Sequence, residues 1–382
     1  MTATPPQVGW AQADARRIHR QFLDEPTDAP PAAVAAAMLG AHAQVLSAAE
    51  LSLALRTADA TRAEVRAALR EDRTLVKTYG PRGTVHLLPA GDLPLWTGAL
   101  SAVPWTRALP DGLRLTEAQT EEVIAAIGDA LTGTELTVDE LTDAIVARTG
   151  PWAGERVMEA FQDKWPRWRQ VTHLAGWRGV LAFGADRGRK VTYTNPGARP
   201  MEGTKALRAL VERYLYAYGP ATPKHFARWL AAPAGWAGEL FAAAAGEGRI
   251  EEVSFEGEAA WVVAGDTEFP DAPARGVRLL PYFDAFSIAS QPRERLFPGK
   301  AYERALAGGQ AGNYPVLLVD GVVAGVWHQR RSGKRIAVTV EPLKRLSATR
   351  VRELEAQAAR VGAILEGTAE LTVGRVEVGP HA

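Results

Sequence analysis

The sequence contains no cysteine in its 382 residues. This absence excludes disulfides, thiolate metal sites, iron–sulfur clusters and cysteine nucleophiles, and it is typical of a protein that works in a reducing cytoplasm. The seven histidines are scattered without the spacing of metal ligands, and glycine-rich nucleotide-binding motifs are missing. We therefore expect neither a bound metal nor a cofactor.

The chain also lacks long apolar runs and a net charge. No apolar run is long enough to cross a bilayer, and the first residues do not form a signal segment, so we expect a soluble cytoplasmic protein with no membrane partner. The 44 basic residues balance 44 acidic ones. This balance argues mildly against a nucleic-acid partner, but it does not exclude a locally basic face.

One order of elements, helices followed by a β-hairpin, recurs along the chain. It is clearest over residues 203–265, where the helical segment KALRALVERYLYAYGP precedes TPKHFARWLA, a helix that begins with an N-cap Thr222 and Pro223. The next segments are an amphipathic helix, AGWAGELFAAAAGEG, and the alternating IEEVSFEGEAAWVV, which reads as a hairpin. This order predicts a winged helix.

The same order is expected in two earlier segments. In residues 115–198 a capped helix, LTVDELTDAIVARTG, is followed by a third helix that begins near Val157 and is interrupted by Pro166, and LAFGADRGRKVTYTN forms the wing. In residues 8–100 the helices are ADARRIHRQFL, PPAAVAAAMLG, a capped SAAELSLALR and TRAEVRAALREDR, and LVKTYGPRGTVHLLP is the hairpin.

From about residue 275 the pattern changes to strands separated by glycine turns. Residues 275–379 alternate like strands and contain one helix, SATRVRELEAQAARVGAIL. We therefore predict a mixed α+β fold with three tandem winged-helix units, at 8–100, 115–198 and 203–265, followed by a C-terminal β-barrel, or a strongly curved sheet, at 275–379. We expect the units to curve around a duplex as a C-shaped clamp.

A polar pair, His42 and Gln44, follows the second helix of the first unit. Gly40 is expected to end that helix, and in the extended backbone beyond it alternate side chains point the same way. Both polar groups can then face one point, with the small Ala43 between them. The alternative interpretation is a polar pair that caps backbone groups at a helix end.

Several cations cluster at hairpins. His86 alternates with Val85 and Leu87 in the first wing, so it is expected to leave the core face, while the segment HQRRSGKR places four cations at one hairpin tip, where only an anion would relieve their repulsion. A solvated turn is the alternative in each case. The candidate nucleic-acid contacts are Arg82, Thr84, His86, Arg167, Arg169, Arg187, Arg189, Lys190, Arg330, Arg331, Lys334 and Arg335.

Four stretches carry a family resemblance that spans nearly the whole chain. They are GAHAQVLSAAELSLALR, RGTVHLLPAGDLPLW, LLPYFDAF and YPVLLVDGVVAGVW, in this order. Together they resemble the AlkZ/YcaQ-like winged-helix DNA glycosylases. In that family the first stretch holds a Gln-x-Gln or Gln-x-Asp motif, and here His42 stands where the first glutamine is usual.

The resemblance implies a monofunctional DNA glycosylase that hydrolyses the N-glycosidic bond of alkylated purines in duplex DNA. It implies that N7 or N3 adducts, bulky adducts and crosslinked bases are substrates, and that the base need not enter a tight pocket. The biological role that it implies is repair of alkylation damage or self-resistance to a DNA-alkylating natural product. We expect a monomer.

The implied chemistry suits the polar pair. N7 or N3 alkylation makes the purine cationic, so it leaves as a neutral base, and the enzyme must stabilise an oxocarbenium-like sugar and place a water at C1′. Gln44 can accept a hydrogen bond from that water, and a neutral His42 can do the same or take its proton. Asp284, in PYFDAF, is expected to form a buried salt bridge that organises the barrel.

Two other functions compete with a glycosylase. Winged helices occur more often in non-catalytic transcriptional regulators, although such a regulator usually carries one unit and dimerises on its operator. A protein-interaction scaffold is the second alternative, since the net charge is zero. Salt-dependent binding to duplex DNA would separate the scaffold from the other two, and release of a base from alkylated DNA would separate the enzyme from the regulator.

Overall fold

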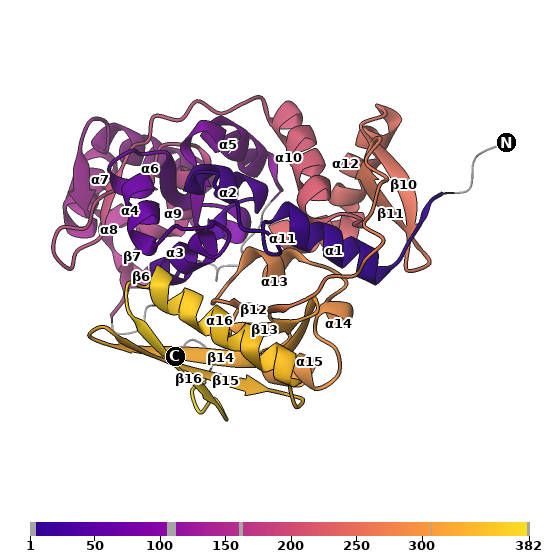
Figure 1. Cartoon of the computed structure of the whole chain (residues 1–382). Helices are drawn as coiled ribbons and strands as arrows, with labels where there is room; N and C mark the ends of the chain where they lie inside the picture. The colour runs from indigo at the N-terminus through magenta and orange to yellow at the C-terminus, as the bar shows by residue number, and fades with distance from the viewer. Residues whose placement is uncertain (1–4, 105–111, 160–162, 307, 380–382) are drawn as a thin grey trace.

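A computed structural model of the chain describes residues 5–104, 112–159, 163–306 and 308–379. The helical part of the molecule lies on one side, and the C-terminal strands with their long helix lie on the other (Figure 1). Within the described ranges, no helix has both the length and the apolar character that crossing a membrane requires.

The first segment begins with a helix and a short strand, continues with two helices and ends with a β-hairpin. These elements are α2 (Pro31–Ala37), β2 (Ala41–His42), α3 (Leu46–Ala54), α4 (Arg62–Arg70), β3 (Leu75–Tyr79) and β4 (Val85–Pro89). The strands form one sheet in the order β2-β4-β3, which confirms the predicted hairpin. The predicted cap of α3 is wrong, because the N-cap residue is Val45, whose side chain has no oxygen. Helix α5 (Leu93–Ala102) follows.

The second segment repeats the order with an interruption. Its elements are α6 (Glu117–Ala130), β5 (Glu135–Thr137), α7 (Val138–Thr149), α8 (Pro151–Gly154), β6 (Arg156–Met158), β7 (Trp165–Pro166), α9 (Thr172–Trp177), β8 (Ala182–Phe183) and β9 (Thr192–Thr194). Thr137 caps α7 as predicted. The long third helix is wrong, because β6, β7 and a 3-10 turn precede the short α9. Pro166, which disfavours a helical residue before it, lies at the end of β7.

The third segment comprises α10 (Gly203–Tyr218), α11 (Pro223–Leu230), α12 (Ala234–Gly246) and the hairpin of β10 (Ile250–Phe255) and β11 (Glu258–Val263). Thr222 caps α11 as predicted. The N-terminal β1 (Gln7–Val8) pairs in parallel with β10, and α1 (Trp10–Arg20) contacts α10. The N-terminal helix, which we had assigned to the first unit, therefore packs against the third segment.

The C-terminal segment forms a five-stranded sheet in the order β12-β13-β14-β15-β16. These strands are β12 (Val277–Leu280), β13 (Val316–Val319), β14 (Val322–Ser332), β15 (Arg335–Pro342) and β16 (Thr368–Val373). The helices are α13 (Ala285–Ala289), α14 (Arg293–Leu296), α15 (Lys300–Ala305) and α16 (Ala348–Ile364).

This sheet is a curled half-barrel, which agrees with the strongly curved sheet of the prediction and not with a complete barrel. Helix α16 crosses the sheet and connects β15 to β16, which pairs in parallel with β15. The last strand therefore lies beyond β15 and does not reach β12, which would have closed the barrel.

The first and last segments share one apolar core. Leu51 and Leu53 of α3 belong to the same buried cluster as Trp327 of β14 and Leu354 of α16, all at most 1% exposed. Burying apolar side chains on both sides of such a junction stabilises it by about 1.5–3 kcal/mol per large side chain. The junction between the two segments therefore holds the loop after α2, which carries His42, in a fixed position.

Candidate functional site

His42 lies where the sequence placed it, in extended backbone directly after a helix stop. Helix α2 ends at Ala37, and Leu39 and Gly40 have positive φ angles of 58° and 90°. The amide of Gly40 donates to the carbonyl of Ala35 at 2.7 Å, which turns the chain out of the helix. Strand β2 then pairs His42 with His86 of β4.

The side chain of His42 forms part of the wall of a pocket of about 530 Å³. Only 7% of the residue is exposed, and its ring stacks on Phe283 with centroids 4.5 Å apart. The His86 ring meets it edge-on at 5.0 Å. Two rings therefore fix the imidazole plane.

Gln44 is exposed and does not line this pocket. Between the two residues Ala43 is 1% exposed, and its amide donates to the carbonyl of Val85 at 2.7 Å, which continues the extended pairing. The two polar groups thus lie on one extended stretch, with His42 in the pocket wall and Gln44 at the surface.

His86 does not face outward, and that prediction is wrong. The residue is 4% exposed, and its Nδ1 lies 2.9 Å from the carbonyl oxygen of Thr84, so it is the nitrogen that donates. The alternation of His86 with Val85 and Leu87 does not indicate exposure here, because β4 is the middle strand of its sheet and is covered on both faces. His86 contacts His42, and burial removes it from the candidate DNA contacts.

Arg82 and Thr84, two of the candidate DNA contacts, reach the pocket wall from the turn between β3 and β4. Arg82 has a φ of 62°, in the left-handed region, and its Nη1 donates to the carbonyl of Trp229 at 2.8 Å. Such a conformation costs an arginine about 1 kcal/mol and persists only where surrounding contacts hold it. The turn therefore directs Arg82 toward the third segment.

Three further polar residues of the pocket were missed by the sequence analysis. His225 and Arg228 come from α11, and Arg293 begins α14. Their separation from His42 along the chain leaves no spacing pattern, so no local signal could have found them. The pocket is built only where α11, α14 and the first hairpin meet.

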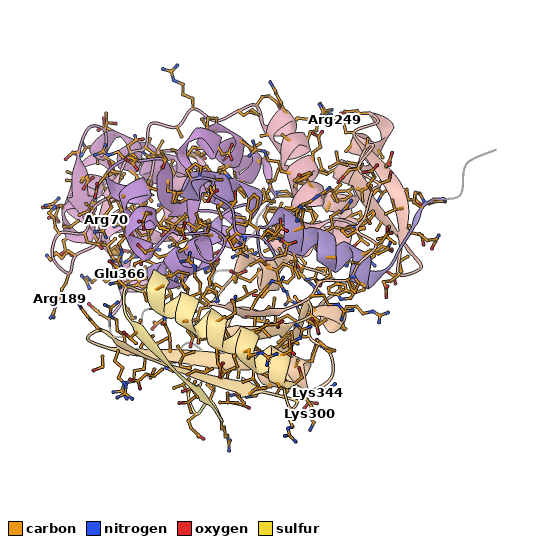
Figure 2. All side chains as sticks on the ribbon, in the orientation of Figure 1. Arg70, Arg189, Arg249, Lys300, Lys344 and Glu366 are labelled. Carbon is orange, nitrogen blue, oxygen red and sulfur yellow. The ribbon has the colours of Figure 1, made fainter. Side chains whose placement is uncertain are left out.

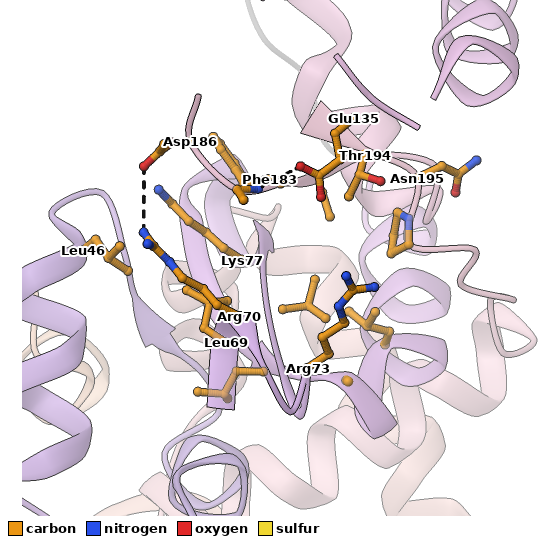
Figure 3. Close-up of a pocket in the computed structure, with 18 residues that line it drawn as sticks. Leu46, Leu69, Arg70, Arg73, Lys77, Glu135, Phe183, Asp186, Thr194 and Asn195 are labelled. Carbon is orange, nitrogen blue, oxygen red and sulfur yellow. Dashed lines mark hydrogen bonds and ion pairs between the residues drawn. The ribbon is translucent and has the colours of Figure 1, made fainter. Parts of the chain in front are cut away.

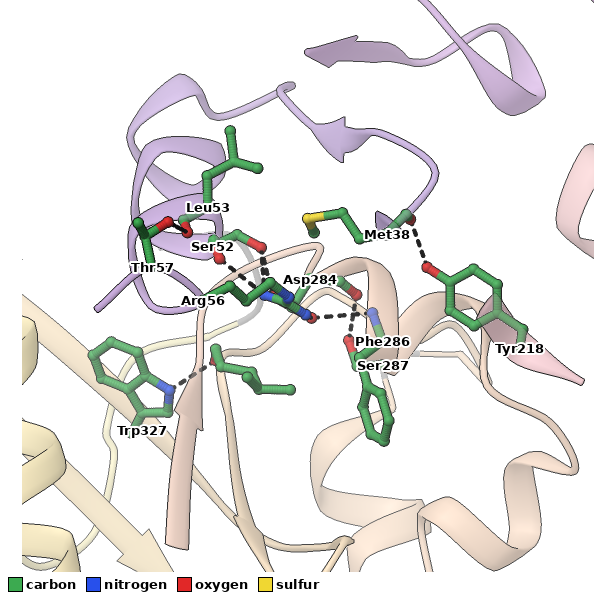
Figure 4. Close-up of polar contacts among 11 residues, drawn as sticks. Met38, Ser52, Leu53, Arg56, Thr57, Tyr218, Asp284, Phe286, Ser287 and Trp327 are labelled. Carbon is green, nitrogen blue, oxygen red and sulfur yellow. Dashed lines mark hydrogen bonds and ion pairs between the residues drawn. The ribbon is translucent and has the colours of Figure 1, made fainter. Parts of the chain in front are cut away.

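A buried ion pair between Arg56 and Asp284, the residue after Phe283, joins the first and last segments (Figure 4). The guanidinium of Arg56 donates to both carboxylate oxygens of Asp284 at 2.8 Å, and the Ser52 hydroxyl donates to one of them at 2.6 Å. Both charged side chains are 0% exposed. The salt bridge predicted for Asp284 is confirmed, but its partner Arg56 lies just after the end of α3 and not within the sheet.

The environment of His42 keeps its imidazole neutral. Burial, then the nearby His86 and Arg82, lower the pKa of His42 from 6.5 to about 2. Burial and Arg82 lower the pKa of His86 to about 3, against the hydrogen bond to Thr84. The Nδ1 atom of His42 is buried without a hydrogen-bond partner among the described residues. At neutral pH both rings are therefore uncharged.

Most basic candidates of the second segment have local partners. Arg167 pairs with Glu155, Arg187 with Glu140 and Lys190 with Asp139. Arg169 lies over the Trp165 ring at 4.2 Å. Arg189 projects outward from the surface (Figure 2). The exposed ion pairs contribute little to stability, so they leave these cations able to exchange partners.

The basic hairpin tip forms as predicted, with Ser332 paired to Arg335 at the end of β14 and β15. Arg331 donates to the carbonyl of Leu365 at 2.6 Å, and Arg335 pairs with Glu370 at 2.5 Å. Arg330 and Lys334 are exposed and form no ion pair within the described ranges. The tip therefore presents free positive charge.

A second pocket, of about 410 Å³, lies between the first and second segments (Figure 3). Its cations are Arg70, Arg73 and Lys77, and the carboxylates Glu135 and Asp186 face them in the same pocket. Arg70 lies 3.9 Å from Asp186. Because this pocket includes neither His42 nor Gln44, and two carboxylates offset most of the charge of its three cations, the pocket at His42 is the candidate site.

Comparisons with known proteins identify relatives of the chain. A family model described as DNA glycosylase AlkZ-like matches residues 35–364. A curated protein of Streptomyces sahachiroi named Interstrand DNA cross-link repair glycosylase is 32% identical over 343 residues, which cover 84% of this chain and 88% of the relative. The solved structure of Streptomyces sahachiroi DNA glycosylase AlkZ superposes with a TM-score of 0.81 at 30% identity, covering 96% of this chain and 100% of that one.

Proposed function

Because the chain belongs to the AlkZ-like family of DNA glycosylases, which hydrolyse N-glycosyl bonds, we propose that it excises alkylated purines from duplex DNA. The proposed substrates carry an alkyl group at N7 or N3, and they include bases of an interstrand crosslink, since a relative is named for crosslink repair. The three helix-and-hairpin segments act as winged helices on the duplex, and the enzyme works as a monomer.

The observation that carries this proposal is the position of His42. It occupies the place of the family's usual first glutamine, and it lines a pocket of about 530 Å³ beside the first hairpin while Gln44 remains exposed two residues later. A water held between the His42 ring and the Gln44 amide would stand where a duplex can reach it. Phe283 and His86 prevent the ring from turning away.

The neutral state of His42 decides its role. A group whose pKa is about 2 is a weak base, so His42 does not take the proton of the water at neutral pH. It accepts a hydrogen bond through Nε2, which requires the ring proton to be on the buried Nδ1. A neutral imidazole and a glutamine amide both offer one acceptor, and His42 therefore replaces the usual glutamine without changing the charge of the site.

The reaction then needs little acid or base catalysis. The bond between C1′ and the purine nitrogen breaks first, its electron pair neutralises the cationic base, and the sugar becomes oxocarbenium-like. The oriented water adds to C1′ and loses its proton to solvent, which leaves an abasic site and a free base. Positioning of this kind contributes about 10²–10⁴-fold, which is adequate for a labile adduct.

Contacts with the duplex come from the free cations of the surface. We assign this role to Arg330 and Lys334 at the hairpin tip, and to Arg189 in the second segment, because none of them has an ion-pair partner within the described ranges. Arg167, Arg169, Arg187, Lys190, Arg331 and Arg335 contribute where DNA phosphates displace their present partners.

The test is an incubation with duplex DNA that contains N7-methylguanine or a bulkier N7 adduct. We expect free base and an alkali-labile abasic site from the wild type. His42→Ala and Gln44→Ala should bind the duplex with unchanged affinity and release base about 10²-fold more slowly. If the wild type binds DNA but releases no base from several cationic adducts, the protein is a DNA-binding regulator instead.

A further inference from the structure

Three arginines line the pocket beside His42 without a carboxylate partner. Arg82 comes from the first hairpin, Arg228 from α11 and Arg293 from α14. Glu294 is the one carboxylate among the lining residues, and no ion pair joins it to any of the three within the described ranges. The pocket therefore concentrates positive charge that the protein itself does not neutralise.

The arginines also repel one another. Burial, then the neighbouring Arg293, lower the pKa of Arg82 to about 10, and burial, then Arg228, lower the pKa of Arg293. The Nε atom of Arg293 is buried without a hydrogen-bond partner among the described residues. Gathering like charges in a partly buried space is unfavourable unless an anion occupies it.

Backbone carbonyl groups hold two of the three arginines, Arg82 and Arg293, in place. Arg82 donates to the carbonyl of Trp229 at 2.8 Å, and Arg293 donates to the carbonyls of Ile288 at 3.0 Å and Gly309 at 3.2 Å. Carbonyl groups orient a guanidinium without neutralising it. These contacts orient the side chains of Arg82 and Arg293, and the positive charges remain available to bind an anionic ligand.

The charge decides which part of a DNA substrate can enter. An alkylated purine is cationic, so a space lined by three arginines repels it. A backbone phosphate is anionic and matches the planar donors of a guanidinium. We propose that this pocket binds one phosphodiester of the DNA backbone next to the lesion, held by Arg82, Arg228 and Arg293. This inference rests on the proposed function, because it takes DNA as the substrate.

Such a phosphate contact fixes the register of the lesion. His42 and the arginines line one pocket, so a phosphate held by the arginines sets the position of the neighbouring sugar relative to the His42 ring. The base itself stays outside this pocket.

The experiment scans single phosphates. Duplexes that contain a tetrahydrofuran abasic-site analogue carry one neutral methylphosphonate at a time, and fluorescence anisotropy gives the Kd of wild type and of Arg293→Gln. We expect one position flanking the analogue where the methylphosphonate weakens wild-type binding about tenfold. Arg293→Gln should weaken binding of the unmodified duplex by about the same factor. In this variant the methylphosphonate at that position should cause no further loss of affinity.

Two further variants test whether the effect is specific to the pocket. Arg228→Gln should show the same coupling, and Arg228 is exposed with one long contact to Gln291 at 3.4 Å, so its loss does not threaten folding. Arg295→Gln is the matched control, because Arg295 neighbours the site, pairs with Glu256 and does not line the pocket. Its effect should be equal at every methylphosphonate position. The slope of log K against log salt should fall by about 0.9 for Arg293→Gln.

The outcomes separate this inference from the proposed function. The phosphate pocket is overturned if, at every position, the methylphosphonate weakens binding of Arg293→Gln and Arg228→Gln by the same factor as it weakens binding of the wild type. This holds even if the wild type excises alkylated bases. Competition by inorganic phosphate at matched ionic strength, without any coupled position, assigns the pocket to a free anion and also overturns the inference. A wild type that shows the coupled position but releases no base from alkylated DNA refutes only the glycosylase function.

Discussion

At the scale of single residues, burial turns His42 from an ionisable group into a neutral one. Its ring is enclosed by Phe283 and His86, and Arg82 adds an unfavourable positive charge for the protonated form. The same position usually holds glutamine in the family that the sequence resembles. Both side chains then present an uncharged acceptor, and this similarity leads to a prediction about substitution.

We predict that His42→Gln keeps base-release activity within about tenfold of the wild type, whereas His42→Ala loses about 10²-fold or more. Because the pKa of His42 is about 2, the wild-type rate should not change with pH between 5.5 and 8 through this residue. Single-turnover base release at several pH values measures both effects. His19→Gln, at an exposed histidine of α1, is the control. A rate that rises with pH around 6.5 and becomes flat in His42→Gln would show instead that His42 acts as a base.

His42 and His86 should also make stability depend on pH. Their pKa values in the folded protein, about 2 and about 3, lie below the unfolded value near 6.5. Between these values the unfolded chain binds more protons, so the free energy of unfolding falls as pH falls below about 6.5. Each histidine contributes at most about 1.4 kcal/mol per pH unit.

Urea unfolding at pH 7.5 and 5 measures this dependence. We expect His42→Gln to lose less stability than the wild type over that range, by about 1–2 kcal/mol. The comparison must be between variants, because burial raises the pKa of Asp14 to about 7, and that carboxyl has the opposite pH dependence. Equal losses in both proteins would mean that His42 is protonated as easily in the fold as in the unfolded chain.

At the scale of elements, one glycine determines how the chain leaves α2. Gly40 has a φ of 90°, and a Cβ there would lie 2.6 Å from a methyl group of Leu88. We expect Gly40→Ala to lower the free energy of unfolding by about 1–3 kcal/mol and to reduce activity, because β2 and His42 would shift. Gly91→Ala is the control, since nothing lies within 4 Å of its added Cβ. Urea unfolding measures the stability of both variants. A similarly small loss of stability in Gly40→Ala and Gly91→Ala would show that the chain leaves α2 without needing a glycine at position 40.

Elements with local signals could be predicted from the sequence. Thr137 and Thr222 mark helix starts by their capping oxygens, and the turn at Asp320 and Gly321 marks the hairpin of β13 and β14. The helix expected from Val157 failed, because its apolar pattern did not reveal that the segment forms β6, β7 and a 3-10 turn. The sequence also could not decide between a barrel and a curved sheet, since the place of β16 depends on the path of α16 and not on the pattern of the strand itself.

The candidate site divides in the same way. Although their meeting in one pocket was not predicted, His42, Arg82 and Thr84 were identified as candidates, because the turn at Gly40 and the first hairpin are visible in the sequence. Arg228 and Arg293 were not, since only the packing of α11 and α14 beside that hairpin brings them to the pocket. The burial of His86 could not be predicted, because the sequence does not show that β4 is the central strand of its sheet.

At the scale of the whole molecule, the Arg56–Asp284 pair couples the first and last segments. Removing one partner leaves the other charge buried without compensation, which costs about 3–5 kcal/mol. We therefore expect Asp284→Ala to lower the free energy of unfolding by that amount. Arg148→Ala, which breaks an exposed pair with Asp129, should cost at most about 1 kcal/mol.

The same substitution should impair catalysis in the protein that remains folded. Asp284 accepts a hydrogen bond from the amide of Phe286 at 3.0 Å and follows Phe283, whose φ of 55° lies in the left-handed region. Loss of the carboxylate frees this turn, and the Phe283 ring no longer fixes His42. Base release at a temperature where circular dichroism shows Asp284→Ala to be folded should therefore be slower than in the wild type, while DNA affinity is unchanged. If the folded variant excises base at the wild-type rate, the ion pair stabilises the junction of the two segments but does not position the His42 ring.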